Sequence, residues 1–362
     1  MHMLKSDRKY HYKIERRSSV PFWHEILAAI LAIAITLLIC GALILQSGAS
    51  LSDAYSALFV GAFGSKKAIL ETLVQATPIL FTGLAMVIAY RANYINLGAE
   101  GQFLFGAIAA TWVGLSFPSL PKPISISLQI TAAIFAGAIW GLIPALMRIK
   151  VGASEIIVTV MLNFVVQYFL SYLVSNPWRP ENEFYNQTAK IATSATWPNL
   201  FDSRLHIGFI IGIFLSLTVL YLIWNTKIGF ELRSVGENPT ASKYKGISIN
   251  KIAILSMMLS GAIAAIGGAG EISGIHHRLK PTISKGYGWT GITIALLGRT
   301  HPIGIIISSI FFGGLINGSS FMKIKTGVES SLADAFQGAA MIVVLILLAV
   351  VQYRVRRIEV NG

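Results

Sequence analysis

Long stretches of apolar residues with almost no charge recur along this chain, each close to the length that crosses a bilayer. The clearest runs from Ile26 to Gln46 and contains no charged residue. A hydrocarbon core about 30 Å thick requires about 20 apolar residues in a helix. Because lipid offers the backbone no hydrogen-bond partner, such segments must be helical. The sequence therefore predicts an all-α polytopic membrane protein.

About ten spans are predicted. Two are less regular: one contains Glu100, and another is short and bounded by glycines. Across the 362 residues, 54% are hydrophobic and 12% are charged, which excludes an ordinary soluble domain. Similar Gly-rich turns within 83–110 and 261–315 indicate a possible internal repeat. The predicted spans are 26–46, 72–90, 92–116, 124–147, 156–175, 205–224, 252–270, 286–298, 302–322 and 335–352.

The positions of the basic residues predict the orientation. With an even number of spans and both termini in the cytoplasm, 18 of the 29 Lys and Arg residues fall on the cytoplasmic side. We expect a basic cytoplasmic tail at 1–25, a transmembrane domain at 26–353 and a cytoplasmic tail at 354–362. Within the domain, 225–251 is the main cytoplasmic segment and 175–205 the main external loop. The net charge of +13 favours contact with anionic lipid headgroups over nucleic acid.

Several kinds of chemistry have no support in the sequence. Cys40 is the single cysteine, so no intramolecular disulfide can form. His276 and His277 are adjacent and lack further metal ligands at suitable spacing. No phosphate-binding loop and no cluster of catalytic acids or histidines is present. We predict that the chain is not an enzyme and carries no metal or cofactor.

The cytoplasmic segment is too structured for a simple tether. Its pattern predicts a short helix near 231–235, a turn at 236–239 and a second short helix that ends before Gly246. Small residues permit the close approach of a partner surface, and basic residues offer it ion pairs. An ordinary basic loop lying on the lipid surface is the alternative.

Four polar residues lie at or near membrane depth: Asn96, Glu100, Gln102 and Asn163. Polar groups within a bilayer are costly and face either protein or a water-filled path. They therefore form either part of a substrate path or a structural hydrogen-bonding hub.

The motifs resemble one transporter family. The pattern Gly229-x-x-x-Arg233-x-x-Gly236-x-Asn238, followed by Ala241 and Gly246, resembles the cytoplasmic coupling loop of ABC permeases of the branched-chain amino-acid, ribose and nucleoside group. The run from Asn96 to Gln102 is similar to a signature of the nucleoside-type members. Residues 151–163 resemble a further element of the same members, and residues 291–315 resemble the closing half of the permease. Ser154, Ser234, Ser242 and Lys243 depart from the usual residues.

This resemblance implies the permease subunit of an importer in a bacterial cytoplasmic (inner) membrane. Gly229, Arg233, Gly236, Asn238, Ala241 and Gly246 would contact a separate ATPase that binds ATP and Mg. An external lipoprotein would deliver a nucleoside, and a second permease would complete the path, as a heterodimer in preference to a homodimer. A simple-sugar permease is the alternative. An ion-coupled secondary transporter is less favoured because acidic residues are scarce in the spans.

Overall fold

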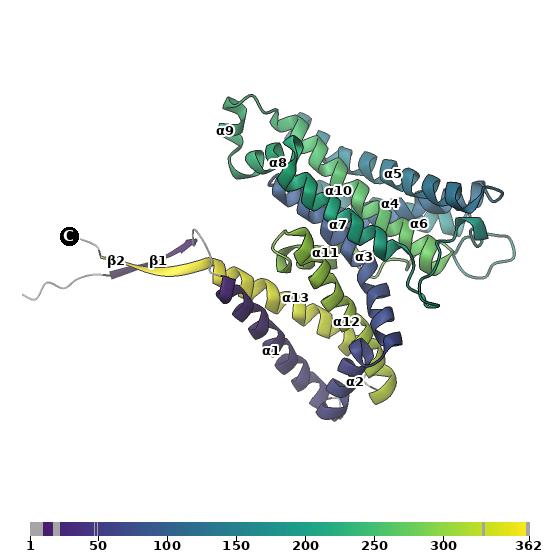
Figure 1. Cartoon of the computed structure of the whole chain (residues 1–362), viewed down its shortest axis with the longest axis horizontal. Coiled ribbons are helices and arrows are strands. Elements are labelled where there is room, and N and C mark those ends of the chain that lie inside the picture. The colour runs from purple at the N-terminus through teal and green to yellow at the C-terminus, as the bar shows by residue number, and fades with distance from the viewer. Residues whose placement is uncertain (1–9, 17–21, 47, 49, 328–329, 360–362) are drawn as a thin grey trace, which may run out of the picture.

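In the computed structural model, which describes residues 10–16, 22–46, 48, 50–327 and 330–359, the chain is a bundle of helices (Figure 1). The helices are α1 (Phe22–Gln46), α2 (Leu51–Phe63), α3 (Lys66–Arg91), α4 (Ala99–Ser116), α5 (Lys122–Val151), α6 (Glu155–Ser175), η1 (Thr193–Ala195), α7 (Gly208–Asn225), α8 (Lys227–Glu237), α9 (Pro239–Tyr244), α10 (Ile249–Glu271), η2 (Ile272–His276), α11 (Tyr287–Leu297), α12 (Pro302–Thr326) and α13 (Ser330–Gln352).

Helices α3, α4, α5 and α10 form the centre of the molecule, which we call the body. Their backbones approach closely because glycines face one another across the helix pairs. A Cβ atom added to Gly268 of α10 would overlap the Phe103 carbonyl oxygen of α4, and one on Gly137 of α5 would overlap that of Gly261. Small residues at such crossings are how membrane helices gain close packing without a hydrophobic driving force. The main chains of these helices therefore lie in direct contact where the helices cross.

A second group of helices, α1, α2, α12 and α13, lies beside the body, and we call it the arm. Helix α1 packs along α13, and α2 packs along α12. Figure 1 shows the α1–α13 pair diverging from the bundle, whereas α12 stays beside α3. Asn317 of α12 ties the second pair to the body, since its amide donates to the Ala68 carbonyl at 3.0 Å.

Helix α11 is short and follows a non-helical segment. The helical run that starts with α10 ends in a π-helical turn at η2, and residues 277–286 then form no helix. Gly286, with a φ of +81°, precedes the first residue of α11. The start of α11 lies against the start of α4, where a Cβ on Gly288 would overlap the Glu100 backbone. Two irregular segments therefore meet inside the bundle.

Each of the ten predicted spans coincides with a helix, which confirms the helical class of the membrane region. Among the described residues, six helices are long and apolar enough to cross a bilayer (α3, α5, α6, α7, α10 with η2, and α12), and several shorter apolar helices accompany them. The number of spans stays a prediction. The tails add a feature that the sequence did not predict: β1 (Tyr10–Arg16) pairs antiparallel with β2 (Tyr353–Glu359).

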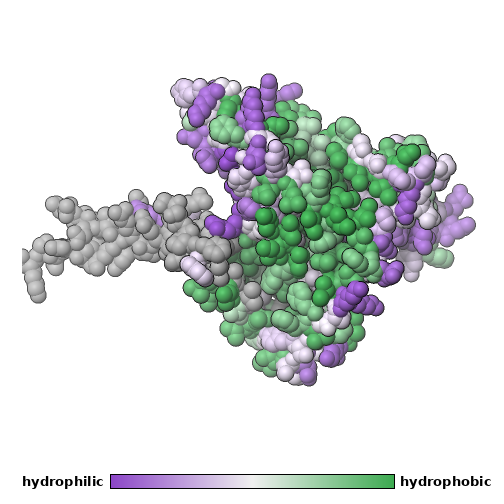
Figure 2. Space-filling model, viewed as in Figure 1, coloured by the Kyte–Doolittle hydropathy of each residue, from purple (hydrophilic) through white to green (hydrophobic). Residues whose placement is uncertain are grey.

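The two ends of the bundle differ. The segment with α8 and α9 and the β1–β2 ribbon lie toward the left of Figure 1, and the loop between α6 and α7 lies at the right. This loop is tied to the chain that follows α10, because the Ile191 and Trp197 amides donate to the carbonyls of His277 and Ser273 at 2.9 and 2.8 Å. Figure 2 shows an apolar surface between hydrophilic groups at these two ends, as expected for a membrane-crossing bundle.

Candidate functional site

The segment between α3 and α4 holds the first predicted site residue, Asn96, which is fully buried. Its amide nitrogen donates to the Gln102 side-chain oxygen at 2.9 Å and to the Ser260 hydroxyl at 2.8 Å. Its amide oxygen accepts from the Gly98 backbone at 2.9 Å. The Ser260 hydroxyl donates in turn to the Ala85 carbonyl of α3 at 2.8 Å. Asn96 and Gln102 thus connect α3, α4 and α10 through side chains that satisfy one another.

Asn163 reaches the same region from α6. Its oxygen accepts from the Gly101 amide at 2.8 Å, and its nitrogen donates to the Leu97 carbonyl at 2.8 Å. The side chain therefore bridges the residues that begin α4, and both ends of its amide are bonded. A buried polar group left without a partner costs about 1–3 kcal/mol, so this bridge fixes the position of the turn.

Glu100 joins the starts of two helices. Its carboxylate accepts a hydrogen bond of 2.7 Å from the Gly288 amide in the first turn of α11. The first amides of a helix have no partner within it, and the helix dipole favours negative charge there. Glu100 therefore caps α11 from a neighbouring helix. Sequence reasoning identified the carboxylate but not its partner, which lies 188 residues away.

The structure brings these four predicted residues together around the turn that starts α4. Asn96, Gln102 and Asn163 are bonded within the protein, and Glu100 extends the group to α11. The assignment of a substrate path stays a prediction.

The segment predicted to couple to an ATPase forms α8 and α9, so the expected helix, turn and helix are present. Helix α8 is longer than predicted, since it starts at Lys227 and runs through Gly236 to Glu237, and the turn is confined to Asn238. The Thr226 hydroxyl caps α8 by accepting from the Gly229 amide at 3.1 Å, and Asn238 caps α9 by accepting from the Ala241 amide at 3.0 Å. Gly246, with a φ of +79°, turns the chain toward α10. These residue types are the usual helix caps and turn formers.

The six predicted coupling residues divide into two groups. Gly229 and Gly236 face the protein: a Cβ on Gly236 would overlap the Arg91 carbonyl oxygen at the end of α3. Arg233 is half-buried. The other three residues, Asn238, Ala241 and Gly246, are exposed. Helix α8 therefore packs closely against the body, whereas the surface of α9 is exposed.

Arg91 links α8 to the far end of α11. Its guanidinium donates to the Thr300 carbonyl, in the turn after α11, at 2.9 Å, and lies 5.1 Å from the Trp224 ring centroid. A displacement of α8 would thus act on the end of α3 and on the turn that follows α11. The sequence contained Arg91 beside a motif, but nothing in the local pattern indicated this bond to a residue 209 positions away.

A family model described as the branched-chain amino acid transport system / permease component matches residues 68–345, most of the chain. The chain belongs to this permease family. The permease is 35% identical over 339 residues to the guanosine ABC transporter permease protein NupP of Bacillus subtilis, covering 92% of this chain and 95% of that protein.

Two further relatives are similar. The glucose ABC transporter permease protein TsgB13 of Haloferax volcanii is 32% identical, covering 95% of the permease and 93% of the relative. The nucleoside ABC transporter permease protein NupB of Lactococcus lactis is 33% identical, covering 82% and 85%. These matches confirm the resemblance seen in the motifs. The chain is an ABC permease that does not hydrolyse ATP, since ATP is hydrolysed by a separate subunit.

The permease also contains buried polar residues that sequence reasoning did not select. Glu271 at the end of α10 is 5% exposed and lies 3.2 Å from the His276 imidazole. The predicted span ended at residue 270, one position before this carboxylate. The π-helical turn at Ile272–His276 brings the two side chains together, and such turns are frequent at functional sites.

Proposed function

We propose that this permease forms the translocation path of a nucleoside importer. The observation that carries the proposal is the 35% identity to a guanosine permease over nearly the full length of both proteins. The 33% identity to the nucleoside permease of Lactococcus lactis supports the same proposal. The 32% identity of this chain to the glucose permease of Haloferax volcanii supports the sugar alternative.

The proposed path runs beside the turn that starts α4. Asn96, Gln102 and Asn163 would shape this turn, and Glu100 would hold the start of α11 against it. A movement of α11 away from Glu100 would free a carboxylate and a helix start, both of which can bind a ribose or a base edge. In this mechanism the contact of Glu100 with Gly288 is one that transport breaks and re-forms.

Coupling is proposed to begin at α9. An ATPase subunit, which binds ATP and Mg, would dock on the exposed surface that includes Asn238 and Ala241. The close contact of Gly236 with Arg91 supports transmission from α8 to α3, and the bond from Arg91 to Thr300 supports transmission to α11. No cofactor is assigned to this chain itself.

The proposed setting is the bacterial cytoplasmic (inner) membrane, with ten spans and with both tails and residues 225–251 in the cytoplasm. A second, different permease and an external binding lipoprotein would complete the importer, the lipoprotein on the side of the 176–207 loop. Asn238→Cys tests the orientation. An impermeant thiol reagent should label this cysteine only after the cells are opened. Labelling in intact cells would show that the chain has the opposite orientation. Cys40, which is buried, gives the background.

The substrate is tested by uptake. The chain is co-expressed with its neighbouring transporter genes in a strain lacking nucleoside and glucose uptake, and labelled guanosine, cytidine and glucose are supplied separately. Guanosine uptake that depends on the chain and on an intact partner ATPase supports the proposal. Glucose uptake without nucleoside uptake would establish the sugar alternative. Uptake that persists with an ATPase unable to hydrolyse ATP would point to an ion-coupled carrier.

A further inference from the structure

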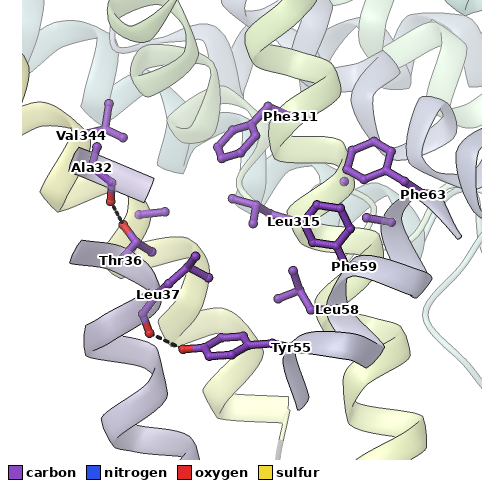
Figure 3. Close-up of a pocket in the computed structure, with 13 residues that line it drawn as sticks. Ala32, Thr36, Leu37, Tyr55, Leu58, Phe59, Phe63, Phe311, Leu315 and Val344 are labelled. Carbon is purple, nitrogen blue, oxygen red and sulfur yellow. Dashed lines mark hydrogen bonds between the residues drawn. The ribbon is translucent and has the colours of Figure 1, made fainter. Parts of the chain in front are cut away.

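A cavity of about 280 Å³ separates the two helix pairs of the arm. In Figure 3, Phe59 and Phe63 of α2 and Phe311 and Leu315 of α12 face Ala32 of α1 and Val344 of α13 across it. Phe59 is 70% exposed and Phe63 44% exposed, so the cavity opens onto the outer surface of the helices. The α1–α13 pair thus rests beside α2 and α12 without filling the space between them.

The cavity lies halfway along the long helices. Phe311 and Leu315 are near the middle of α12 (Pro302–Thr326), and Ala340 and Val344 are near the middle of α13 (Ser330–Gln352). Ala32 and Thr36 are near the middle of α1. The centre of a membrane-crossing helix lies in the hydrocarbon core whichever way the chain is oriented. The medium at the mouth of the cavity is therefore lipid chains.

The walls offer nothing to a polar ligand. Among the described residues, none that lines the cavity is charged, and the two hydroxyl groups present are turned to main-chain carbonyls: Thr36 donates to Ala32 at 2.7 Å, and Tyr55 donates to Leu37. A nucleoside would lose its hydrogen bonds to water here without replacement. Water is excluded for the same reason, since cavities with apolar walls stay dry.

The position of the cavity decides among the apolar occupants. Lipid chains surround the midpoints of membrane-crossing helices, and the exposed ring of Phe59 lies at the mouth of the cavity. A hydrocarbon chain is flexible and can follow an irregular apolar gap between two helix pairs. We propose that an acyl chain of a membrane phospholipid occupies this cavity and fills the contact between the α1–α13 pair and the α2–α12 pair. This proposal does not depend on the transported substrate.

Photolabelling tests the proposal. The full-length protein in detergent is titrated with phosphatidylcholine that carries a diazirine midway along one acyl chain, and labelled peptides are mapped by mass spectrometry. We expect labelling of peptides containing residues 55–63 and 311–315 to saturate at low lipid, whereas labelling at the exposed Tyr168 and Phe169 of α6 should keep rising. Ala340→Phe, which fills the cavity, should weaken saturable labelling about tenfold, equal to about 1.4 kcal/mol.

Ile342→Phe is the matched control, because Ile342 lies on the same helix but is 60% exposed; it should leave the labelling unchanged. If Ala340→Phe does not fold, Leu315→Trp fills the cavity from the opposite wall and should have the same effect. Labelling at the cavity that rises without saturation, or that survives a folded filling variant, would overturn the proposal and show ordinary annular lipid. Cross-linking of these peptides to a second permease chain would overturn it as well.

Discussion

The helices of the body and the α1–α13 pair of the arm differ in how closely they pack against their neighbours. In the body, α10 approaches α4 and α5 so closely that glycines such as Gly268 and Gly261 leave no room for a side chain. In the arm, the α1–α13 pair leaves a cavity of about 280 Å³ against α2 and α12. The difference shows where the chain needs a fixed geometry. The polar residues Asn96, Gln102 and Ser260, which must meet across α3, α4 and α10, lie in the body, whereas the polar side chains among the described residues that line the gap of the arm are two hydroxyls bonded to carbonyls.

The largest expected effect is on the level of folded protein, and it distinguishes a glycine of the body from a glycine of α13. Gly268→Ala places a methyl group on the Phe103 carbonyl and should separate α10 from α4, so we expect a severe loss of folded protein. Gly338→Ala in α13 meets nothing within 4 Å and should leave the level unchanged or slightly raised, because alanine favours helix. The level of monodisperse protein and its thermal unfolding temperature measure both. Equal tolerance of the two changes would remove the distinction between the body and the α1–α13 pair.

The next largest effect is expected on the coupling of ATP hydrolysis to uptake, in a protein that still folds. Gly236→Val should force α8 away from Arg91 because its side chain meets the Arg91 carbonyl. Since α8 lies at one end of the bundle, we expect the protein to assemble but to lose most of its substrate-stimulated ATP hydrolysis and uptake. Gly338→Val is the control with the same change in open space. Normal coupling in Gly236→Val would mean that α8 is only a tether.

The residues that could be read from sequence are those whose pattern is local. The apolar lengths of the spans and the helix–turn–helix order of 227–246 depend on neighbours within a few residues, and the structure agrees with them. The partners of the polar residues are remote: Ser260 lies 164 positions from Asn96. The pairing of β1 with β2 joins opposite ends of the chain in the same way. No local pattern carries such pairings, so the sequence identified Asn96 and Glu100 but left their partners unknown.

A smaller effect separates charge from hydrogen bonding at the body's irregular turn. Glu100→Gln keeps an oxygen that can accept from Gly288, so the protein should stay folded while uptake falls or changes in selectivity. Asn163→Ala removes both bonds to the start of α4 and should cost about 1–3 kcal/mol of stability. Protein level and uptake across purine and pyrimidine nucleosides distinguish the two. Normal uptake by both folded variants would exclude this turn from the path.

The smallest effect is expected at the loop that covers one end of the body. Glu183 accepts from the Gln187 amide at 2.8 Å and from Arg278 at 2.7 Å, and these hydrogen bonds hold the pKa of the Glu183 carboxyl below its usual range. A lowered pKa means that the ionised form stabilises the folded loop above about pH 4.3, the value in an unfolded chain, and that this contribution is lost as pH falls through the folded pKa. The group is on the surface, so the change should be slight.

We expect proteolysis of the loop near Arg179 to increase modestly in acid for the native protein. Glu183→Gln should show that higher cleavage already at neutral pH and depend less on pH, whereas Glu181→Gln at an exposed neighbouring position should behave as the native protein does. Because the arm has no such ion pair among the residues lining its cavity, the unfolding of α1 and α13 should not follow this acid transition. If it does, the loop and the arm unfold together, and the division between body and arm does not extend to the outer end of the bundle.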